Sequence, residues 1–153
     1  MTVTQKAVNI RIFGIPRPQG SKKHVGRGIL VESSNGIKEW RHDVRDAVFS
    51  QYAGPLIDTP VAVCATFLFN RPKGHYGQGR NADRLKPSAP KHLTSTAHGD
   101  IDKILRGLLD AISAGAGGSL IKDDSLVVEV MANKRYVEDG ELPGAYLTVT
   151  KLA

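Results

Sequence analysis

Alternating apolar and polar positions near the start of the chain predict a first β-strand over residues 7–15. The prolines and glycine of segment 16–20 end this strand. A shorter apolar run over 28–32 predicts a second strand, and the residues between the two runs are too polar to pack. Residues 7–33 are therefore interpreted as a hairpin with a long basic tip.

A helical period over residues 37–52 places apolar residues on one face, and Trp40 on that face is interpreted as a core anchor. The near-continuous apolar run 61–69 predicts a central, buried strand. Cys64 lies inside this run, so we expect it to be buried and structural rather than reactive. Because it is the sole cysteine, it cannot form an internal disulfide, which fits a reducing cytoplasm.

The clearest helical pattern covers residues 100–113 and is followed by glycines that end the helix. Two further alternating runs, over 126–137 and 145–151, predict the last strands. The helix carries one continuous apolar stripe, formed by Ile101, Ile104, Leu105, Leu108, Leu109 and Ile112.

The predicted order is β-β-α-β-α-β-β, which indicates the α/β (α+β) class: two layers, with two helices on a mixed, mainly antiparallel sheet. No repeat or linker divides residues 1–153, so a single domain is expected. No apolar stretch is long enough to span a membrane, and the first residues lack the apolar core of a signal peptide. We therefore expect a cytoplasmic protein without a membrane partner.

Acidic residues gather around the helix over 100–113. Asp100 falls at the N-cap position and Asp102 in the first turn, and the pair Asp123–Asp124 follows the helix. Because the chain turns around after the helix, the second pair is expected to return toward the first. Three converging carboxylates at a positive helix end would bind a hard cation such as Mg²⁺ or Mn²⁺. Singly, these residues are more typical of helix caps and turns than of a site, and only together do they favour a site.

Basic residues outnumber acidic ones by 21 to 15, and they are clustered. Segment 17–27 contains no acid, and segment 71–91 contains only Asp83. Basic loops beside an acidic pocket suit a phosphodiester substrate, although a merely solubilising surface is the alternative. The aperiodic stretch 71–99 is long for a compact domain, which indicates a functional or a disordered loop. The candidate DNA-binding residues are Arg17, Lys22, Lys23, Arg27, Arg71, Lys73, His75, Tyr76 and Arg80.

Segments 100–112 and 121–128 resemble the signature of the RusA-type Holliday-junction resolvases. Segments 16–22 and 71–77 resemble the members carried by phages and prophages of high-GC bacteria. The resemblance implies a homodimeric endodeoxyribonuclease that acts on four-way junction DNA in recombination and repair. It also implies a requirement for Mg²⁺ or Mn²⁺, paired symmetric nicks in two opposed strands, and a bacterial or phage-infected host cell.

By this resemblance, the family's metal-binding aspartates fall on Asp100, Asp102 and Asp124. The family's essential lysine falls on Arg106, which keeps the positive charge but cannot give up a proton near neutral pH. Lys103 is the nearest lysine and is the alternative for that role. Two rival readings stay open: a non-catalytic protein that binds branched DNA, and a nuclease for other branched DNA.

Overall fold

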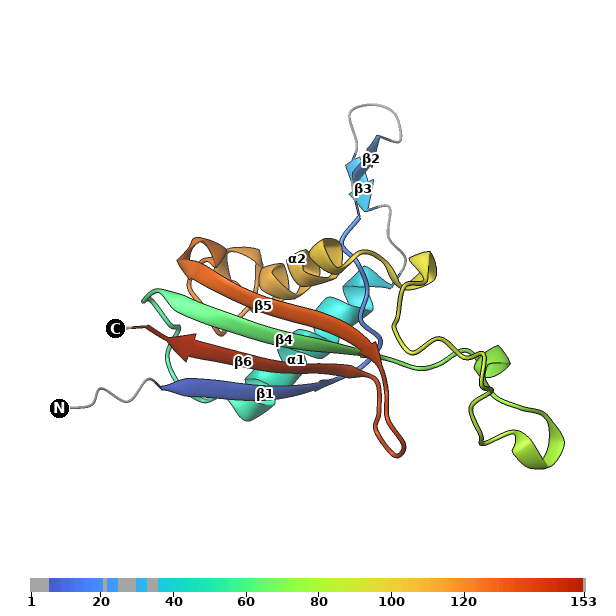
Figure 1. The fold of residues 1–153 in the computed structure, drawn as a ribbon. Coiled ribbons are helices and arrows are strands. Elements are labelled where there is room, and N and C mark those ends of the chain that lie inside the picture. Colours follow the sequence, from blue (N-terminus) through green and yellow to red (C-terminus); the bar gives the residue numbers. More distant parts are fainter. Residues whose placement is uncertain (1–5, 21, 25–29, 33–35, 153) are drawn as a thin grey trace.

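The computed structural model describes residues 6–20, 22–24, 30–32 and 36–152, with the backbone alone for 22–24 and 30–32. It confirms a mixed α+β fold in which two helices lie against one face of a four-stranded sheet (Figure 1). The strand order across the sheet is β1 (Ala7–Phe13), β6 (Gly144–Lys151), β4 (Val61–Phe69) and β5 (Val127–Tyr136). The helices are α1 (Ile37–Gln51) and α2 (Ile101–Ile112). Neither helix is long and apolar enough to cross a membrane.

The sheet is mainly antiparallel, as predicted. Strand β6 pairs antiparallel with both β1 and β4, whereas β5 pairs parallel with β4. A parallel pair needs a crossover connection, and α2 supplies it between β4 and β5. Helix α2 therefore runs opposite to both strands, and its N-terminus lies near the carboxyl ends of β4 and β5 (Figure 1).

The core lies between the sheet and the helices. Trp40 of α1 is completely buried, which confirms its predicted role as an anchor. On α2, Ile104, Leu108 and Ile112 are buried, while Leu105 and Leu109 are only partly covered. The predicted apolar stripe of α2 is thus confirmed, but the side of the stripe that carries Leu105 and Leu109 is only partly covered.

The expectation that Cys64 is buried is wrong, because its side chain is exposed. On β4, Val63 and Ala65 point into the core beneath the helices. Cys64, between them, points to the other face of the sheet, which neither α1 nor α2 covers. The alternation was hidden in the sequence because Ala62 and Cys64, on the exposed face, are also small and apolar.

The predicted hairpin of residues 7–33 is not formed. Strand β1 pairs with β6 instead, and β2 (Lys22–His24) pairs with β3 (Leu30–Glu32) in a separate two-stranded sheet. This small sheet projects from the molecule beside the N-terminus of α2 (Figure 1). Lys22 and Lys23 therefore lie on a separate pair of strands, and the predicted tip between these strands lies outside the described residues.

The stretch between β4 and α2 is folded by local hydrogen bonds. It contains three 3₁₀ turns: η1 (Lys73–His75), η2 (Gly79–Asn81) and η3 (Thr96–His98). Two backbone bonds close its outer part, Gly77 N to Arg84 O at 2.9 Å and Lys86 N to His75 O at 2.9 Å. The loop extends well beyond the sheet, as Figure 1 shows. It is an ordered arm with few apolar contacts.

Candidate functional site

The first turn of α2 presents two carboxylates that the helix does not use. Asp100 occupies the N-cap position, but its side chain caps no backbone N–H group; its backbone carbonyl accepts the N–H of Ile104 at 3.0 Å. Asp102 is exposed in the first turn. Neither carboxylate makes a hydrogen bond or ion pair with another described residue. A purely structural capping role therefore does not account for Asp100.

The segment that leads into the first basic cluster packs directly on this end of α2. The N–H of Gln19 donates to the carbonyl of Lys103 at 3.0 Å. Gly99 has φ +90°, and a Cβ there would lie 2.6 Å from the ring of Pro18. Only glycine fits such a backbone and such a close approach. Pro18 and Gln19 therefore pack against the first turn of α2, which carries Asp100 and Asp102.

Positive groups surround the same helix end. The Nζ of Lys134, on β5, donates to the carbonyl of Gly99 at 3.0 Å. The ring of His98 lies 4.8 Å from the ring of Phe69. Burial lowers the pKa of His98 below its ordinary value, and the charges of Lys134 and Arg17 lower it further. The carboxylates therefore lie in an electropositive neighbourhood that would attract a polyanion.

Arg106 and Lys103 lie on the exposed side of the same helix. Arg106 follows Asp102 by one turn, a spacing that permits an ion pair, but no such pair is formed. Neither basic side chain is committed to another described residue. Both are therefore available to a ligand that approaches the start of α2.

The second acidic pair consists of a turn-capping residue, Asp123, and its neighbour Asp124. Asp123 caps the 3₁₀ turn η5 (Asp124–Leu126) by accepting the N–H of Ser125 at 2.8 Å, and this bond lowers the pKa of Asp123. The pKa of Asp124 is raised, first by its hydrogen bond to the Asp123 carboxyl, then by burial and by the charges of Asp123 and Asp110. These contacts favour Asp124, rather than its neighbour, as the residue open to a ligand.

The acidic pair does not return to the start of α2, contrary to the expectation. Ile121 N donates to Ile112 O at 3.1 Å, and Lys122 N donates to Ile57 O at 2.9 Å. Asp124 therefore lies by the C-terminus of α2 and the start of β4, whereas Asp100 lies at the other end of both. A helix of this length extends about 18 Å. The chain leaving α2 begins β5 at that near end, and it is Lys134, further along β5, that comes back to the N-terminus of α2.

A metal site within one chain is accordingly not found. No group of three His, Cys, Asp or Glu residues in the described part of the chain could hold an ion. Asp100 and Asp102 lie at the N-terminus of α2, whereas Asp123 and Asp124 lie beyond its C-terminus, near Asp110. Within one copy of the chain, the three predicted metal ligands do not fit a shared cation.

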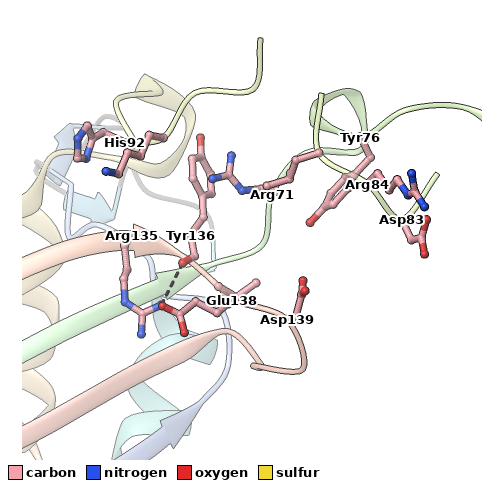
Figure 2. Close-up of a pocket in the computed structure, with 12 residues that line it drawn as sticks. Arg71, Tyr76, Asp83, Arg84, His92, Arg135, Tyr136, Glu138 and Asp139 are labelled. Atoms are coloured by element: carbon pink, nitrogen blue, oxygen red, sulfur yellow. Dashed lines mark hydrogen bonds between the residues drawn. The ribbon is translucent and has the colours of Figure 1, made fainter. Parts of the chain in front are cut away.

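A cavity of about 720 Å³ lies apart from Asp100 and Asp102, between the arm that joins β4 to α2 and the end of β5 (Figure 2). Its walls combine cationic and aromatic side chains of the arm with the end of β5. The guanidinium of Arg71 lies 4.3 Å from the ring centre of Tyr136 and donates to the carbonyl of Pro90 at 2.7 Å. Arg71 thus attaches the arm to the sheet.

Comparison with known proteins decides the family. The family model described as "Endodeoxyribonuclease RusA" matches residues 13–150, nearly the whole chain. The chain belongs to the RusA endodeoxyribonuclease family. Membership supports an endonuclease that resolves Holliday junctions. No curated protein matches the chain significantly.

The predicted DNA contacts of this RusA-family chain differ in their exposure. Lys73 and Arg80 are exposed on η1 and η2, at the outer part of the arm. Tyr76 and Arg17 are half-buried, and His75 packs edge-on against Tyr136 at 5.4 Å between ring centres. Two predicted contacts, Lys22 and Lys23, lie on β2, where the backbone alone is described, and Arg27 lies outside the described residues.

Sequence reasoning missed Lys134 and His98 at this RusA-family site. Lys134 is 34 positions from Asp100 along the chain, and only its place on the helix-facing side of β5, among apolar residues, distinguishes it. His98 directly precedes the Gly99–Asp100 turn, and its closeness to Asp100 is the signal that could have found it. A tertiary contact brings Lys134 to the carboxylates, whereas His98 lies beside them along the chain.

Proposed function

We propose that this RusA-family chain resolves four-way DNA junctions as a homodimer, by symmetric nicks in two opposed strands, and that it requires Mg²⁺ or Mn²⁺. One observation carries the proposal. Asp100 and Asp102 offer free carboxylates at a helix N-terminus that is otherwise surrounded by cationic groups. Negative groups alone would repel a phosphodiester, and positive groups alone would only bind it.

The electropositive surroundings would hold the DNA backbone. Lys134 and Arg17 lie at the carboxylates, and the exposed cations of the arm lie further out, where they would contact the arms of a junction. Such contacts neutralise phosphates and release counterions, which gives most of the affinity without reading sequence. The shape of the junction, rather than a base sequence, is therefore the expected first determinant of binding.

In this proposal the basic residues of α2, Arg106 and Lys103, act on the phosphate. Arg106 keeps its charge at any accessible pH, so it would stabilise charge that builds on the phosphate oxygens, and it would not transfer a proton. Lys103 lies about one turn before Arg106 on α2, and Lys134 donates to the carbonyl of Gly99 at the start of the helix. Asp100 and Asp102 would face the scissile phosphate. A divalent ion would supply Lewis-acid chemistry when bound, but a single chain does not offer the three ligands together.

The decisive experiment is a nicking assay on a synthetic four-way junction with Asp102→Asn. Cleavage should fall about 100-fold or more, because a carboxylate facing the phosphate is lost. Junction binding should stay or tighten, because negative charge near the phosphates is removed. Wild-type protein should cleave with Mg²⁺ and stop with EDTA, and the mapped nicks should lie opposite each other.

The matched control is Asp46→Asn, an exposed aspartate on α1 that faces His42 at 3.2 Å and lies outside the proposed site. Its cleavage rate should stay within about twofold of the wild-type rate. Loss of binding together with cleavage in Asp102→Asn would mean that Asp102 is structural. Wild-type protein that binds junctions in Mg²⁺ without cutting would instead be a non-catalytic binder, and equal cutting of three-way DNA would indicate a broader nuclease.

A further inference from the structure

The arm between β4 and α2 forms a cavity of about 720 Å³ with the end of β5 (Figure 2). This volume falls within the range of about 300–1,000 Å³ that is typical of sites for one small organic molecule. The cavity therefore suits a single nucleotide, whereas a DNA duplex is too large to enter it. Its walls include cationic and aromatic side chains that the candidate site at the start of α2 does not use: Arg71, Arg84, Lys91, His92, Tyr76 and Tyr136.

Tyr76 is held on the arm side of the cavity by the backbone. It forms an antiparallel bridge with Leu85, and backbone hydrogen bonds on either side of this bridge close a short ladder. Both residues line the cavity. The side chain of Tyr76 is half-buried, and its hydroxyl makes no hydrogen bond with another described residue. The arm thus presents a preformed aromatic ring on which a flat ligand would stack.

The β5 side of the cavity is fixed by contacts around Tyr136. The guanidinium of Arg71 lies 4.3 Å from the centre of the Tyr136 ring and donates to the carbonyl of Pro90 at 2.7 Å. The ring of His75 meets the same tyrosine edge-on, with 5.4 Å between ring centres. These contacts hold the arm against the sheet without a ligand, so a ligand does not have to order the arm when it binds.

Cationic groups lie on two sides of the cavity. Figure 2 shows Arg84 on one side and His92 on the other, and Lys91 directly precedes His92. Arg84 and Lys91 are exposed and form no ion pair with another described residue. A nucleotide within a strand has a flat base and a phosphate on either side, which matches this arrangement. The cavity also carries acids that would accept the N–H groups of a base: Asp83, Glu138 and Asp139.

The cavity and the carboxylates adjoin the same end of β5. Lys134, which binds the carbonyl of Gly99 directly before Asp100, lies two residues before Tyr136 on the same face of the strand. Two residues of a strand span about 6.6 Å. A DNA strand held at the start of α2 would therefore bring a nearby nucleotide to the cavity. Extruding a base costs least where its stack is already interrupted, as at a branch point.

We propose that the cavity binds one unpaired nucleotide of the junction, next to its branch point, with the base stacked on Tyr76 and the adjacent phosphates held by Arg84 and Lys91. The inference rests on the proposed function, because that function supplies the branched DNA. Stacking on a tyrosine accepts any base, so the cavity would detect an interrupted duplex rather than a sequence. A free nucleotide has the same chemistry, and the experiment below separates the two sources.

Photocrosslinking tests the contact with the base. Four-way junctions carry 5-iododeoxyuridine at one position at a time near the branch point, and EDTA prevents cleavage. Light should crosslink one of these positions to Tyr76, because the iodinated base reacts with an aromatic ring on which it stacks, and mass spectrometry identifies the crosslinked residue. Tyr76→Phe keeps the ring and should keep the crosslink, whereas Tyr76→Leu should lose it.

The matched control is Phe49→Leu, which removes an exposed ring of α1 outside the cavity and should leave the crosslink unchanged. If Tyr76→Leu fails to fold, Arg84→Gln on the exposed arm should lower the crosslink yield at least about twofold, because a charged phosphate contact is lost. Linear duplex that crosslinks to Tyr76 as strongly as the junction would overturn the proposal. Free 5-iododeoxyuridine monophosphate that crosslinks as strongly would also overturn it, because the cavity would then be a site for free nucleotides.

An abasic nucleotide at the crosslinked position gives a second readout. It should weaken junction binding by the wild type about tenfold, because one stacked base is lost. In Tyr76→Leu the same change should weaken binding by less than about twofold, since the stacking partner is already absent. Equal weakening in both proteins would overturn the proposal. A protein that gives the crosslink but cuts no junction would overturn only the proposed function, and one that cuts junctions without the crosslink would overturn only the nucleotide site.

Discussion

Lys134 is a cation of the candidate site that lies far from the site's other residues in the sequence. A RusA-family lysine is expected at the position of Arg106, and sequence proximity pointed to Lys103 as its alternative. The structure adds a third cation, whose Nζ lies 3.0 Å from the carbonyl of Gly99. This bond attaches the N-terminus of α2 to β5. At the scale of single residues, contact across the fold therefore matters more than spacing along the chain.

The electrostatic contact between Lys134 and His98 gives a prediction that does not require DNA. Removal of the Lys134 charge in Lys134→Met should raise the pKa of His98, because a nearby positive charge disfavours the imidazolium. Burial still acts on the ring, so the pKa should move toward 6.5 without passing it. An NMR titration of the histidine ring protons measures the shift. Lys122→Met, at the other end of α2, is the control and should leave His98 unchanged; equal titration curves in all three proteins would contradict the contact.

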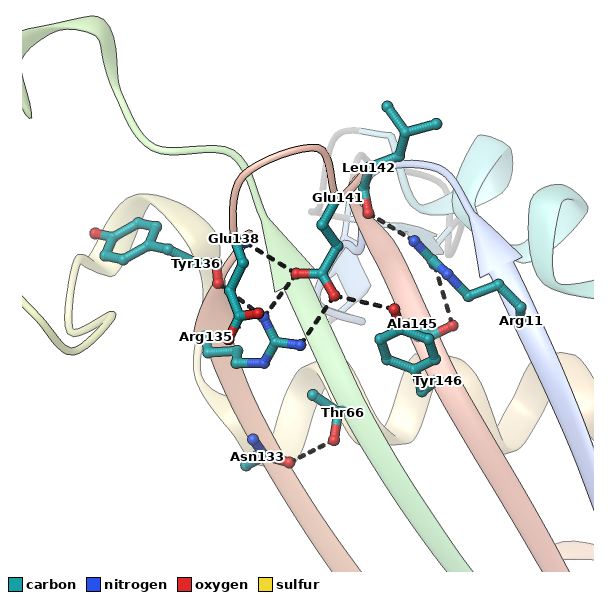
Figure 3. A network of polar contacts seen from close by, with 10 residues as sticks. All are labelled: Arg11, Thr66, Asn133, Arg135, Tyr136, Glu138, Glu141, Leu142, Ala145 and Tyr146. Carbon is teal, nitrogen blue, oxygen red and sulfur yellow. Dashed lines mark hydrogen bonds and ion pairs between the residues drawn. The ribbon is translucent and has the colours of Figure 1, made fainter. Parts of the chain in front are cut away.

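The connection between β5 and β6 is stabilised by a network of side-chain hydrogen bonds. Glu141 accepts both Nη groups of Arg135, at 2.7 and 3.0 Å, and the hydroxyl of Tyr146 at 2.9 Å (Figure 3). On the neighbouring strand, the guanidinium of Arg11 donates to the carbonyl of Leu142 at 2.7 Å. These bonds fix the carboxyl end of β5, which is the end that reaches the candidate site.

The network makes stability depend on pH in a defined direction. The paired guanidinium of Arg135 is the main cause that lowers the pKa of Glu141 from 4.5 to about 2. The ionised carboxylate therefore contributes stability above about pH 4.5, and this contribution is lost as the pH falls toward 2. Glu141→Gln should lower the free energy of unfolding by about 1–3 kcal/mol at pH 7.

Urea denaturation at pH 7 and pH 3 measures this effect. The difference between wild type and Glu141→Gln should be smaller at pH 3, because unfolding at that pH is favoured by proton uptake at the Glu141 carboxylate. The control, Glu39→Gln, replaces an exposed glutamate of α1 and should change stability by less than about 0.5 kcal/mol at either pH. A difference that is independent of pH would show that the Glu141 charge does not stabilise the turn.

The whole molecule extends its basic loops from one end of α2. The β2–β3 pair and the arm between β4 and α2 extend from the end where Asp100 lies (Figure 1). The opposite end carries an exposed ion pair, Lys122 with Asp58 at 3.3 Å. DNA should therefore approach from the end that carries the arm, and its affinity should depend on that end alone.

Salt dependence tests this polarity. The logarithm of junction affinity should fall linearly with the logarithm of salt concentration, with a slope of about −0.9 for each phosphate neutralised. Lys73→Ala and Arg80→Ala, on the exposed turns of the arm, should each reduce the magnitude of the slope by about one. Lys122→Ala is the control and should leave the slope unchanged. Fluorescence anisotropy over a salt series measures all four proteins; an equal slope in all of them would remove the arm from the interface.

Local features of the fold were predictable from the chain alone. The two helices, the strand over Val61–Phe69, the buried anchor Trp40 and the N-cap position of Asp100 are all confirmed. Each depends on apolar period, caps and turn residues within a few positions of one another, and these interactions act wherever the segment lies in the fold. The family resemblance was likewise a local pattern, and the family match over 13–150 confirms it.

The spatial relations between distant segments were decided by the tertiary structure. The exposure of Cys64, the bond from Lys134 to Gly99 and the separation of Asp124 from Asp100 all follow from which strands pair and in which direction. Pairing and direction depend on the packing of every element at once, so no local period encodes them. Residue type and spacing identified the acids of the candidate site, whereas the direction of β5 beside α2 placed them at opposite ends of one helix.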